Sequence, residues 1–308
     1  MPTTVSSAST ATGIPEVRSA VAAARARGLR VALVPTMGSL HEGHLRLIDD
    51  ARRRCGYVVT SIFVNPLQFA PGEDLARYPR DEAGDIARAA GRGSDLVFLP
   101  TVAVMYPEPR SVAVVPHALG QRWEGTARPG HFTGVLTVVA KLFNIVGPDI
   151  AVFGQKDIQQ ATLVRAMVHD LDIPVQVIVA PTVRAANGVA LSSRNAYLDA
   201  GDRTRAAVIK RALDAVGAAY AAGERSGAVL ERVGAREVSA ESRVQLEYLA
   251  VVDPDRLEPA ALAVAGSLVI VAARVGGTRL IDNVILGGST AAGTGDHHGL
   301  PQEGDTGR

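Results

Sequence analysis

Two histidines, His41 and His44, lie three residues apart in the segment PTMGSLHEGH, residues 35–44. On a helix this spacing places both imidazoles on one face. Gly43 between them has no Cβ and leaves room for a ligand close to the backbone. Imidazoles in the first turn of a helix can donate hydrogen bonds to a phosphate whose negative charge grows as a bond breaks. The spacing therefore favours a site for nucleotide phosphates.

Two other interpretations of this segment stay open. His41 and Glu42 could merely cap the helix, with His44 as an ordinary surface residue. A zinc site is a weaker interpretation, because His-Glu-x-His is one residue shorter than the His-Glu-x-x-His spacing that brings two ligands together on a helix.

A second phosphate-binding turn is predicted at GQKD, residues 154–157. Lys156 provides a compact charge that can follow phosphate oxygens, and Asp157 can cap the helix that follows. Gln160 lies one turn further on and faces the same way as Lys156. Only three of the 32 basic residues are lysines, which favours a specific role for a lysine in this turn.

Polar side chains at two further loops complete the candidate site. Ser192, Ser193 and Arg194 place two hydroxyls and a guanidinium in consecutive positions, which together can grip a triphosphate. Asn65 and Gln68 offer amide donors and acceptors suited to a hydroxy acid or an amine. Ordinary turn chemistry explains Asn65 but not Gln68.

The elements that must position these residues alternate between strand and helix. Apolar, β-branched runs predict strands over 29–34, 57–64, 96–99, 149–153 and 175–179, and helical periodicity predicts helices over 14–27, 45–54, 81–92 and 133–146. This order predicts a parallel sheet, which keeps its ligands at the carboxyl ends of its strands. Beyond about residue 186 the pattern changes to α+β, with helices over 202–222 and 227–239 and strands over 244–251, 268–275 and 278–286.

We therefore predict an α/β protein with a Rossmann-like parallel-sheet N-terminal domain over 1–185. A smaller α+β C-terminal domain over 186–288 is expected to close over it as a lid. Residues 1–12 have neither a basic start nor an apolar core, so we expect a frayed leader rather than a signal peptide. The polar tail, 289–308, is expected to be disordered.

The net charge and the cysteine content limit the partners and the cellular compartment that we expect for this protein. The 308 residues carry a formal net charge of +1, which leaves no electrostatic footprint for nucleic acid or anionic membranes. The single cysteine, Cys55, excludes an internal disulfide and indicates a reducing, cytoplasmic location. We expect Cys55 to be an unreactive residue that contributes only to packing.

Five segments in consistent order resemble the pantoate–β-alanine ligase (pantothenate synthetase) family of the His-x-Gly-His nucleotidyltransferase superfamily. They are residues 35–44, 65–69, 128–132 (RPGHF), 154–160 and 191–194 (LSSR), and the resemblance covers about residues 14–286. It implies ATP-dependent condensation of (R)-pantoate with β-alanine to give pantothenate, through a pantoyl adenylate, with release of pyrophosphate and AMP. It also implies a homodimer.

The resemblance assigns roles to residues of this chain. The catalytic set is His41, His44, Lys156, Ser192, Ser193 and Arg194, with His44 expected to hydrogen-bond or protonate the departing pyrophosphate. The ATP-binding set is Pro35, Met37, Gly38, Ser39, Leu40, His41, Glu42, Gly43, His44, Gly154, Gln155 (by its backbone only), Lys156, Asp157, Val183, Leu191, Ser192, Ser193 and Arg194. The pantoate and β-alanine set is Asn65, Gln68 and Gln160.

One segment departs from the family pattern. Some relatives carry adjacent acidic residues able to approach a metal where this chain has Gly84 and Asp85. We therefore interpret Asp85 as a solvated helix residue and expect Mg²⁺ to arrive on the ATP phosphates, with water as its main ligand. The roles of Arg128, His131 and Lys141 stay open.

Two rival functions remain. A plain nucleotidylyltransferase would require more cationic groups around the acceptor, whereas Gln and Asn occupy those positions here. A nucleotide-binding regulatory protein would bind ATP without catalysis. Pantoate-dependent release of pyrophosphate from ATP would separate all three.

Overall fold

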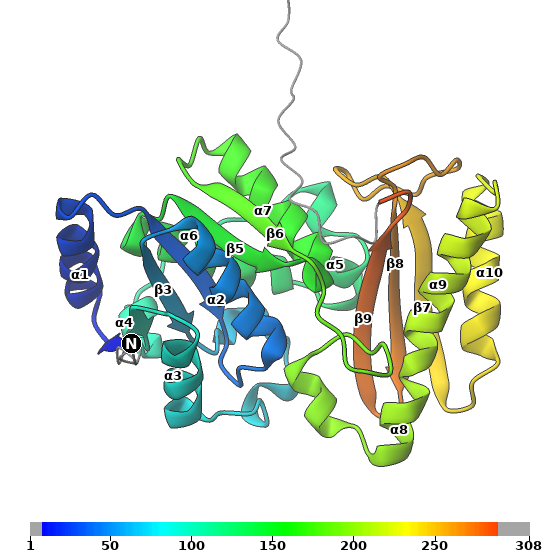
Figure 1. The fold of residues 1–308 in the computed structure, drawn as a ribbon, viewed down its shortest axis with the longest axis horizontal. Helices are drawn as coiled ribbons and strands as arrows, with labels where there is room; N and C mark the ends of the chain where they lie inside the picture. Colours follow the sequence, from blue (N-terminus) through cyan, green and yellow to red (C-terminus); the bar gives the residue numbers. More distant parts are fainter. Residues whose placement is uncertain (1–7, 289–308) are drawn as a thin grey trace, which may run out of the picture.

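A computed structural model describes residues 8–288, and these form two sheets with helices packed on them (Figure 1). The larger sheet has six parallel strands in the order β1-β4-β3-β2-β5-β6. Their bounds are β1 Ser9–Ala11, β2 Val31–Thr36, β3 Tyr57–Ile62, β4 Leu96–Phe98, β5 Ile150–Gly154 and β6 Gln176–Ala180. The predicted α/β class and parallel sheet are confirmed.

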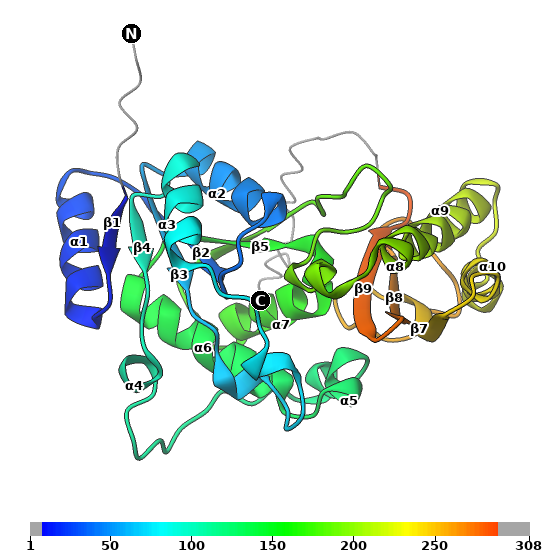
Figure 2. The ribbon, with the colours of Figure 1, turned by 90° about the horizontal axis from the view of Figure 1, so that it is seen from below.

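Helices cover both faces of this sheet, as Figure 2 shows. On one face lie α1 (Ile14–Ala26), α6 (His131–Val146) and α7 (Ile158–Asp170), and on the other α2 (Glu42–Arg54) and α3 (Glu82–Gly91). Two short helices, α4 (Val102–Met105) and α5 (Glu124–Ala127), lie in the connection to α6. Because both faces are covered, the central strands are continuous apolar runs instead of alternating ones, as in residues 31–34.

The C-terminal part is an antiparallel sheet of β7 (Val244–Val252), β8 (Leu268–Val275) and β9 (Thr278–Ile285). One face packs on α9 (Ala207–Ala221) and α10 (Gly227–Ser239) in a separate hydrophobic core, and α8 (Ala200–Arg205) precedes them. The other face packs against Trp123 and Ile158 of the N-terminal part. The predicted α+β character is therefore confirmed, and within residues 8–288 no helix has the length and apolarity to cross a membrane.

Two predictions about elements are wrong. Residues 9–11 were expected to be frayed, but they form the edge strand β1, which pairs in parallel with β4. The single helix expected over 202–222 is two helices that meet at Ala206. The expected disordered tail at 289–308 lies outside the described residues, as do the first seven residues of the expected leader.

The strand order changes direction between β2 and β5. From β2 the chain adds β3 and then β4 on one side, whereas β5 and then β6 lie on the other. In open α/β sheets the crevice at such a switch point, outside the carboxyl ends of the strands, binds ligands. Both predicted phosphate-binding turns follow these two strands, so the topology brings them together.

Candidate active site

The turns after β2 and β5 line one cavity of about 210 Å³. His41, Gly43 and His44 contribute from the first turn, and Gly154, Lys156 and Asp157 from the second. Segments from elsewhere in the chain close the cavity, namely Asn65 and Gln68, Gln160, and the loop of Val183 and residues 191–194. The structure thus gathers segments that were predicted separately.

The backbone fixes the orientation of the two imidazoles. His41 is the N-cap of α2, and its Nδ1 accepts a hydrogen bond from the Gly43 N–H at 3.1 Å. The His44 Nδ1 accepts from the His41 backbone N–H at 3.4 Å. Because both Nδ1 atoms act as acceptors, each neutral ring carries its proton on Nε2. The capping interpretation and the phosphate interpretation are therefore compatible, since a ring that caps the helix still has an Nε2–H donor.

Gly43 has a second role besides the one predicted. A Cβ at this position would lie 2.9 Å from the His41 Nδ1 and 2.8 Å from its Cε1, closer than side chains approach one another. The space at Gly43 is thus used by the His41 ring. Any larger residue here would push the ring out of its capping position.

Burial keeps both histidines neutral. It is the largest cause of a pKa lowered to about 3 for His44 and to about 4 for His41, and the positive charge of Lys156 contributes to both shifts. His131, which also lines the cavity, has its pKa lowered to about 4 by burial and by Arg128. At neutral pH these rings are hydrogen-bond donors and not proton donors, which favours the first of the two roles expected for His44.

These shifts predict acid sensitivity of the folded state. An unfolded histidine titrates near ~6.5, so between pH 6.5 and about 4 the unfolded chain binds more protons than the folded one. The free energy of unfolding should be level above pH 6.5 and should fall below it, by at most ~1.4 kcal/mol per pH unit for each histidine. Urea unfolding at pH 7.5, 6 and 5 measures this, and His44→Gln should give a shallower slope. A free energy unchanged between pH 7.5 and 5 would contradict the assignment.

The turn before α2 depends on Asp85 of α3, and our interpretation of this residue was wrong. Asp85 is 1% exposed, and its two carboxylate oxygens accept hydrogen bonds from the backbone N–H groups of Ser39, at 2.6 Å, and Leu40, at 2.7 Å. Arg88 pairs with it at 2.7 Å. Gly38 and Ser39 have φ values of 80° and 50°, a left-handed backbone that needs such support. Asp85 therefore holds the predicted phosphate-binding turn in shape.

Lys156 lies in a 3₁₀ turn, Gln155–Asp157, between β5 and α7. Its Nζ is 3.1 Å from Asp157 Oδ1. Burial alone would raise the pKa of Asp157, but Lys156 outweighs it and the pKa is lowered, so the carboxylate stays charged. The Asp157 side chain makes no capping hydrogen bond to α7, contrary to our expectation.

The loop after β6 reaches across to the first turn. The Ser193 hydroxyl donates to the Ser39 carbonyl at 3.3 Å, and Ser192 accepts from the Arg194 N–H. The Arg194 guanidinium forms a bidentate pair with Asp74, with distances of 2.9 and 3.0 Å. Burial would raise the pKa of Asp74, but Arg194 lowers it on balance. Arg194 is thus a cation held in place by an ionised partner.

Gln68 is held at both its side chain and its backbone. Asn65 donates to the Gln68 Oε1 at 3.0 Å, which directs the Gln68 Nε2 donor toward Met37 Sδ, 3.0 Å away. The Gln68 carbonyl lies 2.8 Å from His131 Nδ1 and accepts from Arg128 at 3.2 Å. Asn65 is 1% exposed, so its amide serves Gln68 and the backbone. Arg128 and His131, whose roles the sequence leaves open, thus both contact the backbone of Gln68.

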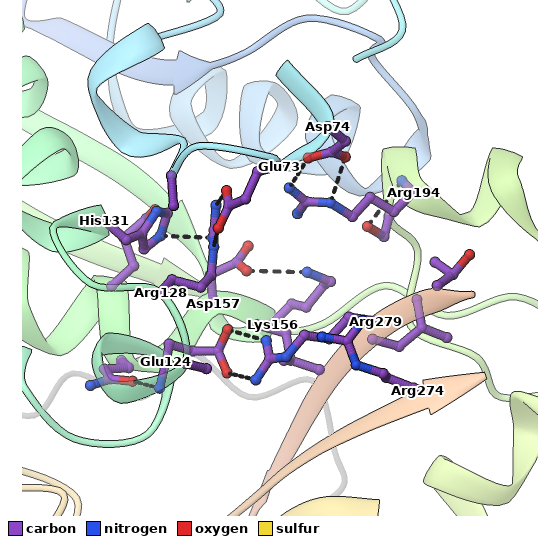
Figure 3. A pocket seen from close by; sticks show the side chains of 18 of the residues that line it. Glu73, Asp74, Glu124, Arg128, His131, Lys156, Asp157, Arg194, Arg274 and Arg279 are labelled. Atoms are coloured by element: carbon purple, nitrogen blue, oxygen red, sulfur yellow. Dashed lines mark hydrogen bonds and ion pairs between the residues drawn. The ribbon is translucent and has the colours of Figure 1, made fainter. Parts of the chain in front are cut away.

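A larger cavity of about 650 Å³ opens from the first, between the two parts of the chain (Figure 3). Both are lined by Arg128, His131, Lys156, Asp157, Gln160, Ser192 and Arg194. The C-terminal sheet adds Arg274 and Arg279, and Arg279 pairs with the buried Glu124 at 2.5 and 2.7 Å. The site is therefore a small chamber with a wider, charged entrance.

Several predicted residues do not line the smaller cavity with their side chains. Leu40 packs in the core, Glu42 pairs with Arg92 at 2.6 Å, and the Gln155 amide faces Asn283 at 3.1 Å. Gly38 and Ser39 form the turn itself. Pro35, Met37, Val183 and Leu191 do line the cavity. No local pattern pointed to Asp74, which pairs with Arg194, or to Glu73, which pairs with Arg128 at 2.6 Å, because both partners are distant in the sequence.

Cys55 is the C-cap residue of α2, and it is buried. Burial raises the pKa of its thiol, which keeps it protonated and unreactive. This finding agrees with the expected packing role.

Comparison with known proteins identifies the family. Residues 9–285 match the family model for pantoate-beta-alanine ligase. The chain is 51% identical over 273 residues to the pantothenate synthetase of Moorella thermoacetica, covering 89% of this chain and 96% of that protein. The crystal structure of pantothenate synthetase from Thermus thermophilus has a TM-score of 0.86 at 47% identity, covering 90% of this chain and 99% of that one.

A further crystal structure, pantoate-beta-alanine ligase from Francisella tularensis complexed with beta-gamma ATP and beta-alanine, has a TM-score of 0.75 at 31% identity. It covers 90% of this chain and 97% of that one. Sequence, family model and fold agree over nearly the whole described chain, and the chain belongs to the pantoate–β-alanine ligase family.

Proposed function

We propose that the cavity at the switch point binds ATP and pantoate and performs the family's reaction, the ATP-dependent condensation of pantoate with β-alanine. The observation that carries this proposal is the convergence of His41 and His44, Lys156 and Arg194 on the chamber that also holds the oriented Gln68 amide. The relative complexed with beta-gamma ATP and beta-alanine supports the choice of ligands.

In the first half-reaction a pantoate carboxylate oxygen attacks the α-phosphorus of ATP, and the bond to the pyrophosphate oxygen breaks. The two Nε2–H groups, the Lys156 ammonium, the Arg194 guanidinium and the serine hydroxyls would donate to the triphosphate and to the leaving group. Donors aimed where charge develops are the main source of catalysis in such sites. Phosphate oxygens would compete with Asp157 for Lys156 and with Asp74 for Arg194.

Pantoate would lie beside the neutral amides. The Gln68 Nε2 donor and the Gln160 amide both face the cavity and suit the hydroxyls and carboxylate of a hydroxy acid. Asn65 would act through Gln68, which it orients. In the second half-reaction the β-alanine amine attacks the activated carbonyl and AMP leaves. One chamber for all reactants removes the entropy of their encounter.

Magnesium would enter as part of the ATP complex. Within residues 8–288 no three His, Cys, Asp or Glu side chains are grouped as a metal site would require. At α3, where some relatives carry paired acids, the Asp85 oxygens already serve two backbone N–H groups and Arg88. A resident metal does not fit there, and no step here depends on one.

We further propose a division into two domains at 185/186, a cytoplasmic location and a homodimer. Separate hydrophobic cores support the division. ATP consumption and the free, buried Cys55 support the location. The homodimer is supported by the family resemblance alone, and light scattering of the purified chain measures it directly.

Pantoate-dependent release of pyrophosphate from ATP tests the proposed function. ATP and Mg²⁺ with pantoate should give one equivalent of pyrophosphate per site in a single turnover, and adding β-alanine should give AMP and pantothenate. Pyrophosphate release that does not require pantoate would indicate a nucleotidylyltransferase with another acceptor. Binding of ATP without any release would indicate a regulatory protein.

A further inference from the structure

Strand β9, at the edge of the C-terminal sheet, runs beside the phosphate-binding segments of the N-terminal part (Figures 2 and 3). Two adjacent residues of this strand, Asp282 and Asn283, are 3% and 1% exposed. Neither lines either of the two cavities described above. Buried polar side chains are costly unless they are fully hydrogen-bonded, so their partners show what they do.

Asn283 holds the turn that carries Lys156. Its Nδ2 donates to the carbonyl of Gln155 at 2.8 Å and to that of Lys156 at 3.1 Å. Its Oδ1 accepts from the Gln155 Nε2 at 3.1 Å. Two donations to successive carbonyls fix the orientation of the peptide planes on either side of the Lys156 Cα. The direction in which the Lys156 side chain leaves the backbone is therefore set by the C-terminal sheet.

Asp282 holds the base of the loop that carries Ser192–Arg194. It forms a bidentate pair with Arg184, with distances of 2.5 and 3.0 Å, and it also accepts from the Asn283 N–H. Arg184 in turn donates to the Gly188 carbonyl at 3.1 Å. Residues 183–191 form a small hairpin through the Arg184–Ala190 bridge and the Leu191 N–H to Val183 carbonyl bond. That hairpin leads directly into Ser192–Arg194.

We propose that Asp282 and Asn283 are positioning residues that hold the Lys156 turn and the Ser192–Arg194 loop at a fixed mutual distance. Successive side chains of a strand point to opposite sides, so two neighbours can reach two different segments. The C-terminal part thus sets the geometry of the phosphate site in addition to covering it. This proposal rests on the proposed function, because it assigns Lys156 and the loop to the triphosphate.

Separate assays of the two half-reactions test the proposal. In Asn283→Ala the Lys156 turn loses both donations, and a displacement of about 1 Å at such a site can cost ~10²-fold. We expect pyrophosphate formation to slow by ~10–10²-fold. Synthesis of pantothenate from added pantoyl adenylate and β-alanine should be much less affected, because no pyrophosphate leaves in that step. We expect its slowing to be at least ~10-fold smaller than that of pyrophosphate formation.

A conservative variant and a matched control separate positioning from folding. Asn283→Asp keeps the shape and the acceptor but turns an oxygen toward the two carbonyls, so it should slow pyrophosphate formation at least as much as alanine does. Ser267→Ala removes a different buried polar group, the hydroxyl of the residue just before β8, which accepts from the Val264 N–H at 3.0 Å. It should lower the melting temperature without changing the ratio of the two half-reaction rates.

If Asn283→Ala is too unstable to assay, Asp282→Asn tests the other arm. It keeps the shape while weakening the pair with Arg184, and we expect the KM for ATP to rise ~10-fold or more with a smaller change in kcat. The proposal is overturned if the Asn283 variants slow both half-reactions equally, or neither, or if Asp282→Asn leaves the KM for ATP unchanged. An unmodified protein that releases no pyrophosphate would refute the proposed function instead.

Discussion

Replacing Lys156 by alanine should slow pantoyl-adenylate formation by at least ~10²-fold, the scale for removing one positioned charge donor. Lys156 lines both the chamber and its entrance, and Asn283 fixes the turn that carries it. Lys156→Arg should also slow adenylate formation, because the larger, planar guanidinium cannot adjust to the phosphate oxygens as a compact ammonium does. Single-turnover pyrophosphate release measures both variants.

Lys210 offers a matched control. It lies on α9 and pairs with Asp214 one turn along the same helix, so Lys210→Ala removes a lysine that lines neither cavity. Its rate of pyrophosphate release should match that of the unmodified chain. A fully active Lys156→Arg would show that any positive patch suffices at this turn, and the specific role of Lys156 would be withdrawn.

His44→Ala should separate the two half-reactions. The ring is neutral, with a pKa of about 3 caused mainly by burial, and its Nε2–H is the donor left after Nδ1 accepts from the backbone. Loss of one such donor costs ~10²–10³-fold where charge develops. Pyrophosphate exists only in the first step, so adenylate formation should slow by that factor. Pantothenate synthesis from added pantoyl adenylate should stay within ~10-fold of the unmodified rate.

The control for this variant is His169→Ala, which removes an exposed histidine that pairs with Asp170 at the end of α7. Both half-reactions should be unaffected. Circular dichroism should show that His44→Ala keeps its fold. Equal losses in the two steps would mean that His44 shapes the chamber as a whole and does not act on the leaving pyrophosphate.

The elements were predictable from the sequence where apolar periodicity is strong. All five runs predicted as strands of the parallel sheet form strands of it, and residues 268–275 and 227–239 have the predicted bounds. The strand Ser9–Ala11 was missed because it has three small residues and only one buried position, which gives no period to detect. Short edge strands are defined by their neighbour, here β4, and not by their own pattern.

The convergence of the two turns on one cavity could be expected from the sequence, because each turn has a local signature, a strand followed by glycine and a helix. The residues that hold those turns in place could not be predicted from the sequence. Asp85 accepts a hydrogen bond from the Ser39 N–H, 46 residues away in the sequence. Asn283 donates to the carbonyls of Gln155 and Lys156, which are 128 and 127 residues away. No periodicity links such positions, and only the assembled fold brings them within hydrogen-bond distance.

The most direct test of the central claim follows oxygen from pantoate to AMP. Pantoate labelled with ¹⁸O in both carboxylate oxygens is turned over with ATP and β-alanine, and the products are weighed by mass spectrometry. Attack of the carboxylate on the α-phosphorus leaves one labelled oxygen bridging the carbonyl carbon and the phosphorus. When the amine of β-alanine attacks the carbonyl carbon, that oxygen leaves as part of AMP. We predict one ¹⁸O in AMP and one in the pantothenate amide. Label in pyrophosphate or inorganic phosphate, with none in AMP, would contradict adenylate formation at this site.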